Sequence, residues 1–203
     1  MKKILFLIIL VISNFTYAEV WKFDAILNDK VIGQHTFIYE NEKTISNANF
    51  KFEYLFMDFI YQHKSTETWQ DGCLKTIESN TDDDGDLYEV SGYSATDQFL
   101  VTTNNETAAL PLCVMTFAYG NPKILEQKKL MNSQNGKYLD VDIQFLREEN
   151  HMVKGKDILT DLWQIEAKGD DGDLLVYLWY DKNMNWVSLK SQTPIGDMQY
   201  KLK

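Results

Sequence analysis

Three histidines are the side chains of this sequence best suited to acid–base chemistry near neutral pH. His35 and His63 lie in alternating stretches, in step with aromatic residues, so both are predicted to point into the interior. Glu67 shares the face of His63, two pleats further along, and this cluster could transfer protons if a cleft opened there. The alternative is an interior polar cluster whose hydrogen bonds set strand register. His151 lies in a polar stretch that predicts a solvated loop.

Recognised catalytic and metal-binding motifs do not add to this cluster. The sequence lacks Gly-x-Ser-x-Gly, His-Glu-x-x-His, a phosphate loop and Cys-x-x-Cys, and neither Ser46 nor Ser65 has a context that marks an activated nucleophile. Acidic stretches at 82–86 and 170–173 suggest calcium, but they lack the spacing of a calcium-binding loop, and Asp-Gly is an ordinary turn signal. We therefore predict two turns, no metal site and no cofactor.

Aromatic residues are the more informative feature, because they alternate along four successive stretches between residues 20 and 70 and so share one face. This face is either an ordinary core or the wall of a cavity for an apolar, lipid-like ligand, since curved sheets often enclose one small molecule. Both interpretations stay open at this point. The expected cavity residues, including two from a later segment, are Phe37, Phe52, Tyr54, Tyr61, Trp69, Phe117 and Tyr119.

The first eighteen residues have the composition of an export signal. Lys2 and Lys3 precede an uncharged apolar run over residues 4–12, and Thr16 and Ala18 offer small side chains at positions −3 and −1 of a cleavage point after Ala18. The run is too short to cross a bilayer, which requires about 20 apolar residues. We expect an exported, periplasmic protein without a transmembrane segment in the mature chain.

Charge and cysteine content narrow the partners and the compartment. The chain has 30 acidic and 20 basic residues without a basic stripe, which argues against nucleic acid as a partner. In an oxidising compartment, Cys73 and Cys113 are expected to form one disulfide. It would close a loop of roughly 40 residues, a stabilisation of ~4 kcal/mol in the chain-entropy model. The alternative is two buried thiols.

The strands that position these residues follow from alternation over most of residues 19–203, which we interpret as a single β domain. We predict a mainly β fold: a strongly curved antiparallel meander or half-open barrel of about eleven strands. The continuous apolar run at 174–180 predicts a strand buried on both faces. Residues 111–136 lack alternation, and Asn121 as N-cap with Pro122 predicts a helix running to about residue 131. We expect this short helical insert to pack on the concave face.

Several runs resemble one known family. They are Ile32-Gly-Gln-His35, Tyr61-Gln-His63, Glu67-Thr-Trp69, Gly72-Cys-Leu74, residues 81–85, 113–122 and 130–136, and Leu178-Trp-Tyr180. Together they resemble the exported domain-of-unknown-function family 6134, with Gly120 where the family pattern has tryptophan and Leu112 where it has glycine. The resemblance implies no established activity. The strand pattern is remotely similar to the helix-plugged sheets of periplasmic lipoprotein-localisation factors, which hold acyl chains, although a shared fold is weak evidence of function.

Three functions therefore remain open. The first is a non-enzymatic binder or carrier of an apolar, lipid-like ligand. The second is an envelope enzyme that acts on a lipid or small molecule through His63 and Glu67, with His35. The third is a structural partner in an envelope complex, which would show as an exposed apolar patch.

Overall fold

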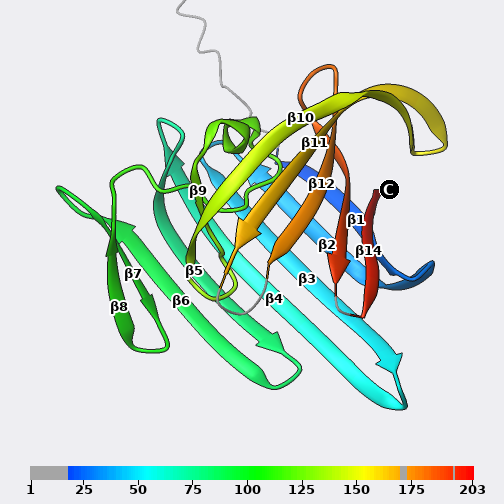
Figure 1. The fold of residues 1–203 in the computed structure, drawn as a ribbon. Coiled ribbons are helices and arrows are strands. Elements are labelled where there is room, and N and C mark those ends of the chain that lie inside the picture. Colours follow the sequence, from blue (N-terminus) through cyan, green and yellow to red (C-terminus); the bar gives the residue numbers. More distant parts are fainter. Residues whose placement is uncertain (1–17, 170–172, 194) are drawn as a thin grey trace, which may run out of the picture.

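The strands of the computed structural model form one continuous antiparallel sheet (Figure 1). The structure describes residues 18–169, 173–193 and 195–203, so the predicted signal segment and most of the acidic turn at 170–173 lie outside the described residues. The strands are β1 (Glu19–Leu27), β2 (Lys30–Glu40), β3 (Lys43–Tyr54), β4 (Met57–Gln70), β5 (Cys73–Asp83), β6 (Asp86–Ser94), β7 (Phe99–Thr103), β8 (Glu106–Leu110), β9 (Lys129–Met131), β10 (Tyr138–Val153), β11 (Lys156–Lys168), β12 (Leu174–Asp181), β13 (Trp186–Thr193) and β14 (Gly196–Leu202).

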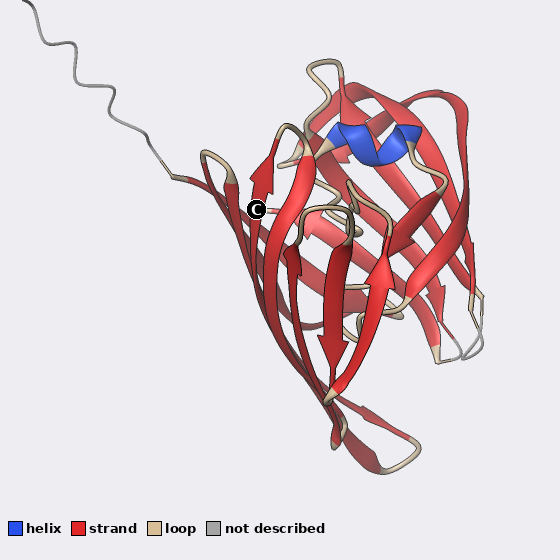
Figure 2. Ribbon diagram, turned by 90° about the vertical axis from the view of Figure 1, so that its left-hand side faces the viewer, coloured by secondary structure: helices blue, strands red, loops and turns tan. Residues whose placement is uncertain are grey.

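The strand order is β8-β7-β6-β5-β4-β3-β2-β1-β14-β13-β12-β11-β10-β9. Two meanders are thus joined where β1 pairs with β14, so the first and last strands lie in the middle of the sheet. The edges are β8 and β9, and the segment between them passes from one edge to the other. The strongly curved sheet resembles a barrel that is not closed, as Figure 2 shows from the side.

The prediction of a mainly antiparallel β fold is confirmed, but the predicted strand number of about eleven is wrong, since the described residues form fourteen. Two short strands explain part of the difference. β8 is almost wholly exposed and so has no apolar alternation, and β9, with three residues, is too short for a period to be read. β12 is buried mainly on one face, with Val176, Leu178 and Tyr180 inside, so the prediction of burial on both faces is also wrong.

The predicted helical insert is wrong as well. A 3₁₀ turn, η1 (Pro122–Glu126), begins as expected, with the Asn121 side chain accepting a hydrogen bond from the Lys123 N–H at 3.1 Å. The backbone becomes extended at Gln127, and the following residues form β9, which pairs with β10 and makes a parallel bridge to Thr116. Leu130 and Met131 are fully buried in this strand, so tertiary pairing replaces the second helical turn.

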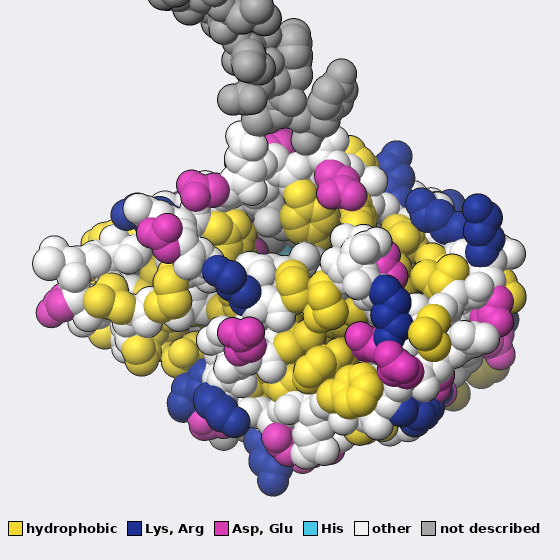
Figure 3. Space-filling view, turned by 90° about the horizontal axis from the view of Figure 1, so that it is seen from above, with side chains coloured by type: hydrophobic (Ala, Val, Ile, Leu, Met, Phe, Trp, Pro, Cys, Tyr) yellow, Lys and Arg dark blue, Asp and Glu magenta, His cyan; other side chains and the backbone are white. Residues whose placement is uncertain are grey.

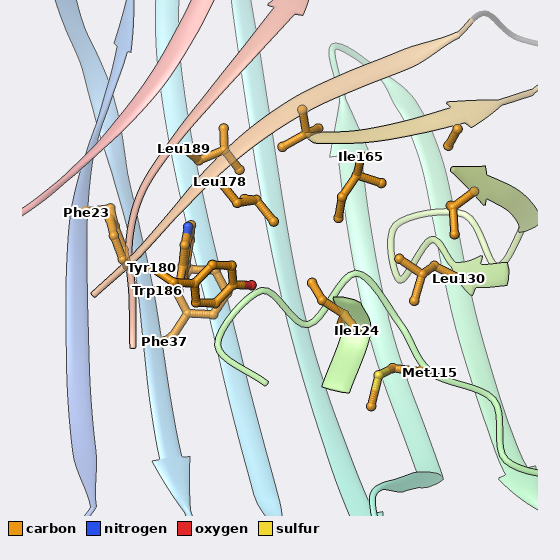
Figure 4. Close-up of a cluster of buried hydrophobic side chains, with 13 residues drawn as sticks. Phe23, Phe37, Met115, Ile124, Leu130, Ile165, Leu178, Tyr180, Trp186 and Leu189 are labelled. Carbon is orange, nitrogen blue, oxygen red and sulfur yellow. The ribbon is translucent and has the colours of Figure 1, made fainter. Parts of the chain in front are cut away.

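The largest hydrophobic core lies between β1, β2, the segment 115–125 and β10–β13 (Figure 4). Its centre is Trp186, which is fully buried and stacks on Phe23 with ring centroids 4.2 Å apart. Ile124 of η1 packs into the same cluster, so the insert does cover part of the interior, in a mainly extended form. A second cluster packs β5–β7 against Val114 and Met131.

Candidate functional site

A cavity of about 500 Å³ lies inside the curved sheet. One wall is formed by inward residues of β2, β3 and β4, and the opposite wall by residues of β12, β13 and β14. Segments 117–122 and 132–134 cover it, and the turns at Asn41–Glu42 and Asp71–Gly72 border it at one end. From above, hydrophobic side chains surround a hollow in which a histidine is visible (Figure 3). The volume is in the range that holds a drug-sized molecule.

Strand register arranges the polar side of this cavity in three transverse rows. Because side chains alternate, residues directly opposite each other on β2 to β5 point to the same face. The rows are His35–Ala48–His63–Thr81, Phe37–Ser46–Ser65–Ser79 and Tyr39–Thr44–Glu67–Ile77. The middle row has three serines, and two of them, Ser46 and Ser65, line the cavity, where leucine or phenylalanine would fill part of the space.

His35 is held by two hydroxyl groups. Its Nε2 lies 2.6 Å from Ser46 Oγ and its Nδ1 lies 3.1 Å from the Tyr200 hydroxyl. The ring also stacks on Phe37, with centroids 4.0 Å apart. Burial, together with the nearby His63, lowers the pKa of His35 to about 3, so the ring is neutral at pH 7.

The hydrogen bonds of His63 determine its tautomer. Its Nδ1 lies 2.9 Å from Thr81 Oγ1, and that hydroxyl donates its single proton to the Gln134 carbonyl at 3.1 Å. The Nδ1 atom must therefore donate to Thr81, which leaves Nε2 as an acceptor without a partner among the described residues. Burial lowers the pKa of His63 to about 4, so this neutral form holds at pH 7.

Glu67 is a buried acid without an ion pair in the described part of the chain, and it is only 5% exposed. Burial raises the pKa of its carboxyl group to about 7. Thr116 approaches the carboxyl group and opposes part of this rise, although Thr116 Oγ1 has no partner at ordinary hydrogen-bonding length. Glu67 is four residues from His63 on an extended strand, about 13 Å along it, so the two line one cavity without forming a catalytic pair.

The predicted cavity residues divide into two groups. Phe37, Trp69, Phe117 and Tyr119 line the cavity, and the Trp69 Nε1–H donates to Thr44 Oγ1 at 3.2 Å. Phe52, Tyr54 and Tyr61 lie nearer the other end of β3 and β4 and do not line it. Phe52 stacks on Phe59 and Tyr61 on Phe50, while Tyr54 is exposed.

Sequence reasoning missed the residues that β12–β14 contribute to the opposite wall. They include Val176, Leu189, Met198 and Tyr200. Alternation at 198–202 predicts a strand, but the β1–β14 pairing that brings Tyr200 to His35 links residues from opposite ends of the chain. No local signal carries that information.

The cavity is acidic. Among the residues that the structure describes, its lining includes Glu42, Glu67 and Asp71 but neither lysine nor arginine. A lysine does approach the border, since a Cβ at Gly72 would lie 2.5 Å from Lys123 Nζ. The interior therefore favours a neutral or cationic group over an anion.

The disulfide prediction is confirmed: Cys73 and Cys113 are bonded, with Cα atoms 4.5 Å apart. The bond joins the start of β5 to the insert, and the Leu74 N–H donates to the Val114 carbonyl beside it. Gly120 is close to Tyr39, because a Cβ there would lie 2.0 Å from the Tyr39 hydroxyl oxygen. Tyr39 thus occupies the space next to this part of the insert.

Two other expectations concern histidine and metal. His151 lies in β10 and not in a loop, which corrects the prediction, and its half-buried ring stacks on Trp179 at 4.6 Å outside the cavity.

Among the described residues, no group of three or more His, Cys, Asp or Glu side chains could hold a metal ion. In the same residues, no helix is long and apolar enough to span a membrane.

The fold and the cavity define a β-barrel-like protein with an acidic interior. A similar solved structure is the crystal structure of a beta-barrel-like protein of domain of unknown function DUF1849 from Brucella abortus. The two share a TM-score of 0.68 and 10% sequence identity, over 92% of this chain and 95% of that one, so the likeness shows the fold alone. The chain itself belongs to the family Domain of unknown function (DUF6134), which matches residues 23–203. No curated protein matches it.

Proposed function

We propose that the protein is a periplasmic, non-enzymatic carrier of a small, lipid-like amphiphile. The observation that carries the proposal is the internal cavity, which combines an aromatic wall with two polar groups: the Glu67 carboxyl group, which has no ion pair among the described residues, and His63 Nε2, which has no hydrogen-bond partner among them. Binding sites for small molecules are typically of this kind: mostly apolar, with a few polar groups that orient the ligand. The apolar body would contact Phe37, Trp69 and Phe117.

The charge of the cavity sets the polarity of the ligand. An anion would face the buried Glu67 and the acidic border without a lysine or arginine among the lining residues. A neutral acceptor group would accept a hydrogen bond from protonated Glu67, and a cation would pair with its carboxylate. Because the pKa of Glu67 is about 7, raising the pH from 6 to 8 strengthens binding of a cation and weakens binding of a neutral acceptor.

The test uses three ligands of equal chain length: octanol, octylamine and octanoate. Calorimetric titration of the mature protein at pH 8 should show binding of octanol or octylamine, with octanoate at least about tenfold weaker, a difference of ~1.4 kcal/mol. Native mass spectrometry of protein purified without detergent should show a bound mass that organic extraction removes. If none of the three ligands binds and the native mass is that of the bare chain, the carrier proposal fails.

Matched variants locate the binding site. Ser65→Leu places a large side chain in the cavity wall and should abolish binding, whereas Thr66→Leu, on the opposite face of the same strand, should not. Equal loss of binding in both variants would place the ligand elsewhere.

One contact favours the alternative function, an envelope enzyme. Ser46 Oγ lies 2.6 Å from His35 Nε2, as in a nucleophile–base pair. The third group is the Tyr200 hydroxyl and not a carboxylate, and with a pKa of about 3 His35 is a weak base at neutral pH. Labelling by a serine-directed fluorophosphonate that disappears in Ser46→Ala would establish the enzyme and overturn the carrier.

A further inference from the structure

The end of the β3–β4 hairpin carries a cluster of exposed apolar side chains. Residues 54–57, which we call the hairpin tip, are Tyr54, Leu55, Phe56 and Met57. Phe56 is 96% exposed and Leu55 69% exposed, the highest values among the large hydrophobic residues that the structure describes. Single exposed apolar residues are common on protein surfaces, but four in succession at one tip are not.

The backbone of the hairpin tip is unusual for its residue types. Leu55 and Phe56 have positive φ angles, 50° and 67°, in a two-residue turn where asparagine, aspartate and glycine are preferred. Among the described residues, the other two-residue turns with two positive φ angles hold asparagine, aspartate or glycine at one or both positions: Asn28–Asp29, Asp71–Gly72, Asp84–Gly85, Asn104–Asn105 and Lys154–Gly155. Two bulky apolar residues are therefore present where the turn itself disfavours them, so the preference of the fold does not explain them.

The hairpin tip also projects from the sheet (Figure 1). On one side β2 pairs with β3 only as far as Gly33 opposite Phe50, and on the other β5 pairs with β4 only from Asp83 opposite Tyr61. Residues 51–60 therefore form a two-stranded ribbon, about 15 Å long, without a flanking strand among the described residues. At its base, Ile60 is hydrogen-bonded to Asp84 of the β5–β6 turn.

Charged residues follow directly behind the apolar end. Lys51 Nζ lies 3.5 Å from Asp58 Oδ2, diagonally across the ribbon. Glu53 lies directly opposite Asp58 in the strand register. The four residues of the hairpin tip have no charge. The ribbon thus has an apolar end with a charged group behind it on one face, which we call the collar, while Phe52 and Phe59 continue the apolar surface on the other face. An apolar end followed by polar residues is typical of segments that enter the interface of a membrane, where tyrosine marks the boundary.

We propose that the hairpin tip inserts into the interfacial region of a lipid bilayer. A protein partner is less suited to this surface, because a specific interface buries about 800 Å² on each side and four side chains at a narrow tip present less. The collar contains two acids and one lysine, so attraction to anionic lipids does not contribute. Binding should therefore be as strong on neutral as on anionic lipid and insensitive to salt.

This contact would orient the molecule. The turns at Asn41–Glu42 and Asp71–Gly72, which border the cavity, are at the opposite ends of β3 and β4 from the hairpin tip. Insertion would therefore hold the protein on a membrane with this border directed away from the lipid. The inference does not depend on the carrier function.

The test is cosedimentation of the mature protein with phosphatidylcholine vesicles. The main variant, Leu55→Asn with Phe56→Gly, removes the apolar end and supplies the residues that the turn prefers. It should bind vesicles at least tenfold more weakly while its Tm stays the same or rises. The control, Val31→Asn with Leu87→Asn, removes two other exposed apolar residues and should bind as the wild type does.

A direct readout is Phe56→Trp, whose additional fluorescence should shift to the blue on vesicles and be quenched by lipids brominated near the headgroup. Four results would overturn the proposal: no sedimentation of the wild type, undiminished binding of the main variant, equal loss in the control, or binding that requires anionic lipid and falls with salt. Self-association that the main variant alone abolishes would instead assign the hairpin tip to a second copy of the chain.

Discussion

The two walls of the interior differ in the size and polarity of their side chains. On β11–β13 and β1 the inward positions hold large apolar groups, such as Ile165, Leu178 and Trp186, that are fully buried and contact one another. On β3–β5 the inward positions of the middle row hold Ser46, Ser65 and Ser79. The first region forms a packed core, from which Val176 and Leu189 also reach the cavity, and the second region supplies polar groups of the cavity through Ser46 and Ser65. We therefore expect stability to depend mainly on the first region and the proposed ligand binding mainly on the second.

The largest effect should come from truncating the packed wall. Trp186→Ala removes a fully buried ring that stacks on Phe23 and donates to the Ser188 carbonyl. We expect the free energy of unfolding to fall by about 3–5 kcal/mol in urea denaturation. Its counterpart on the polar wall, Ser79→Ala, removes a buried hydroxyl without a partner among the described residues, and should stabilise the protein by about 1 kcal/mol. Equal losses in both variants would contradict the comparison.

The next effect concerns the disulfide, which joins the start of β5 to the insert. Replacing Cys73 and Cys113 by serine should lower the free energy of unfolding by about 2–4 kcal/mol. The insert should also become more accessible, because Val114 and Met115 are then held only by packing and by hydrogen bonds from the Leu74 and Met131 N–H groups to their carbonyls. Hydrogen exchange at residues 114–121 measures this, with β11 as the internal reference. Uniform loss of protection in both segments would show that the bond has no local role.

Glu67 gives the polar wall a pH-dependent stability. Its pKa is about 7 in the folded protein against an ordinary value of 4.5, so the unfolded chain ionises first as pH rises. Between pH 4.5 and about pH 7 the free energy of unfolding of the wild type should fall by up to about 3 kcal/mol. Above this range Glu67 should cause no further loss. Glu67→Gln should therefore match the wild type near pH 4.5 and exceed it by up to this amount at pH 8.

The buried histidines have the opposite dependence. The pKa values of His35 and His63 are about 3 and 4, below the ordinary 6.5. Their contribution to the free energy of unfolding is therefore full above pH 6.5 and declines as the pH falls toward these values. The stability of the wild type should be greatest near pH 6.5. Because the histidines are present in both proteins, the difference between Glu67→Gln and wild type isolates the carboxyl group. A pH-independent difference would show that Glu67 is solvated.

The smallest effect concerns the contact between β12 and the segment that covers the cavity. The Tyr180 hydroxyl, on β12, donates to the carbonyl of Tyr119 in the covering segment at 2.7 Å. Tyr180→Phe should cost about 1 kcal/mol of global stability. If the covering segment controls entry, ligand association should accelerate in this variant, beyond what this small loss of stability explains. Stopped-flow mixing with the octyl ligand that binds in the calorimetric titration measures the association rate. An unchanged rate would show that the covering segment does not control ligand entry.

Several features could be predicted from the sequence because their cause is local. Alternation in β1, β2 and β4 follows from side chains that point to opposite faces, and it indicated that His35, His63 and Glu67 point inward. The start of η1 at Asn121–Pro122 follows from capping chemistry within three residues. The disulfide followed from the cysteine count and the expected compartment.

Tertiary structure decided which inward residues enclose a space. Phe52, Tyr54 and Phe37 show the same alternation, but only Phe37 faces β12–β14, because the ribbon at 51–60 extends beyond the neighbouring strands. The same holds for residues 129–131, whose helical prediction yields to pairing with β10. Alternation determines the face of a strand and not its position opposite the rest of the molecule. That position depends on the β1–β14 pairing, a contact between the two ends of the chain that no local pattern contains.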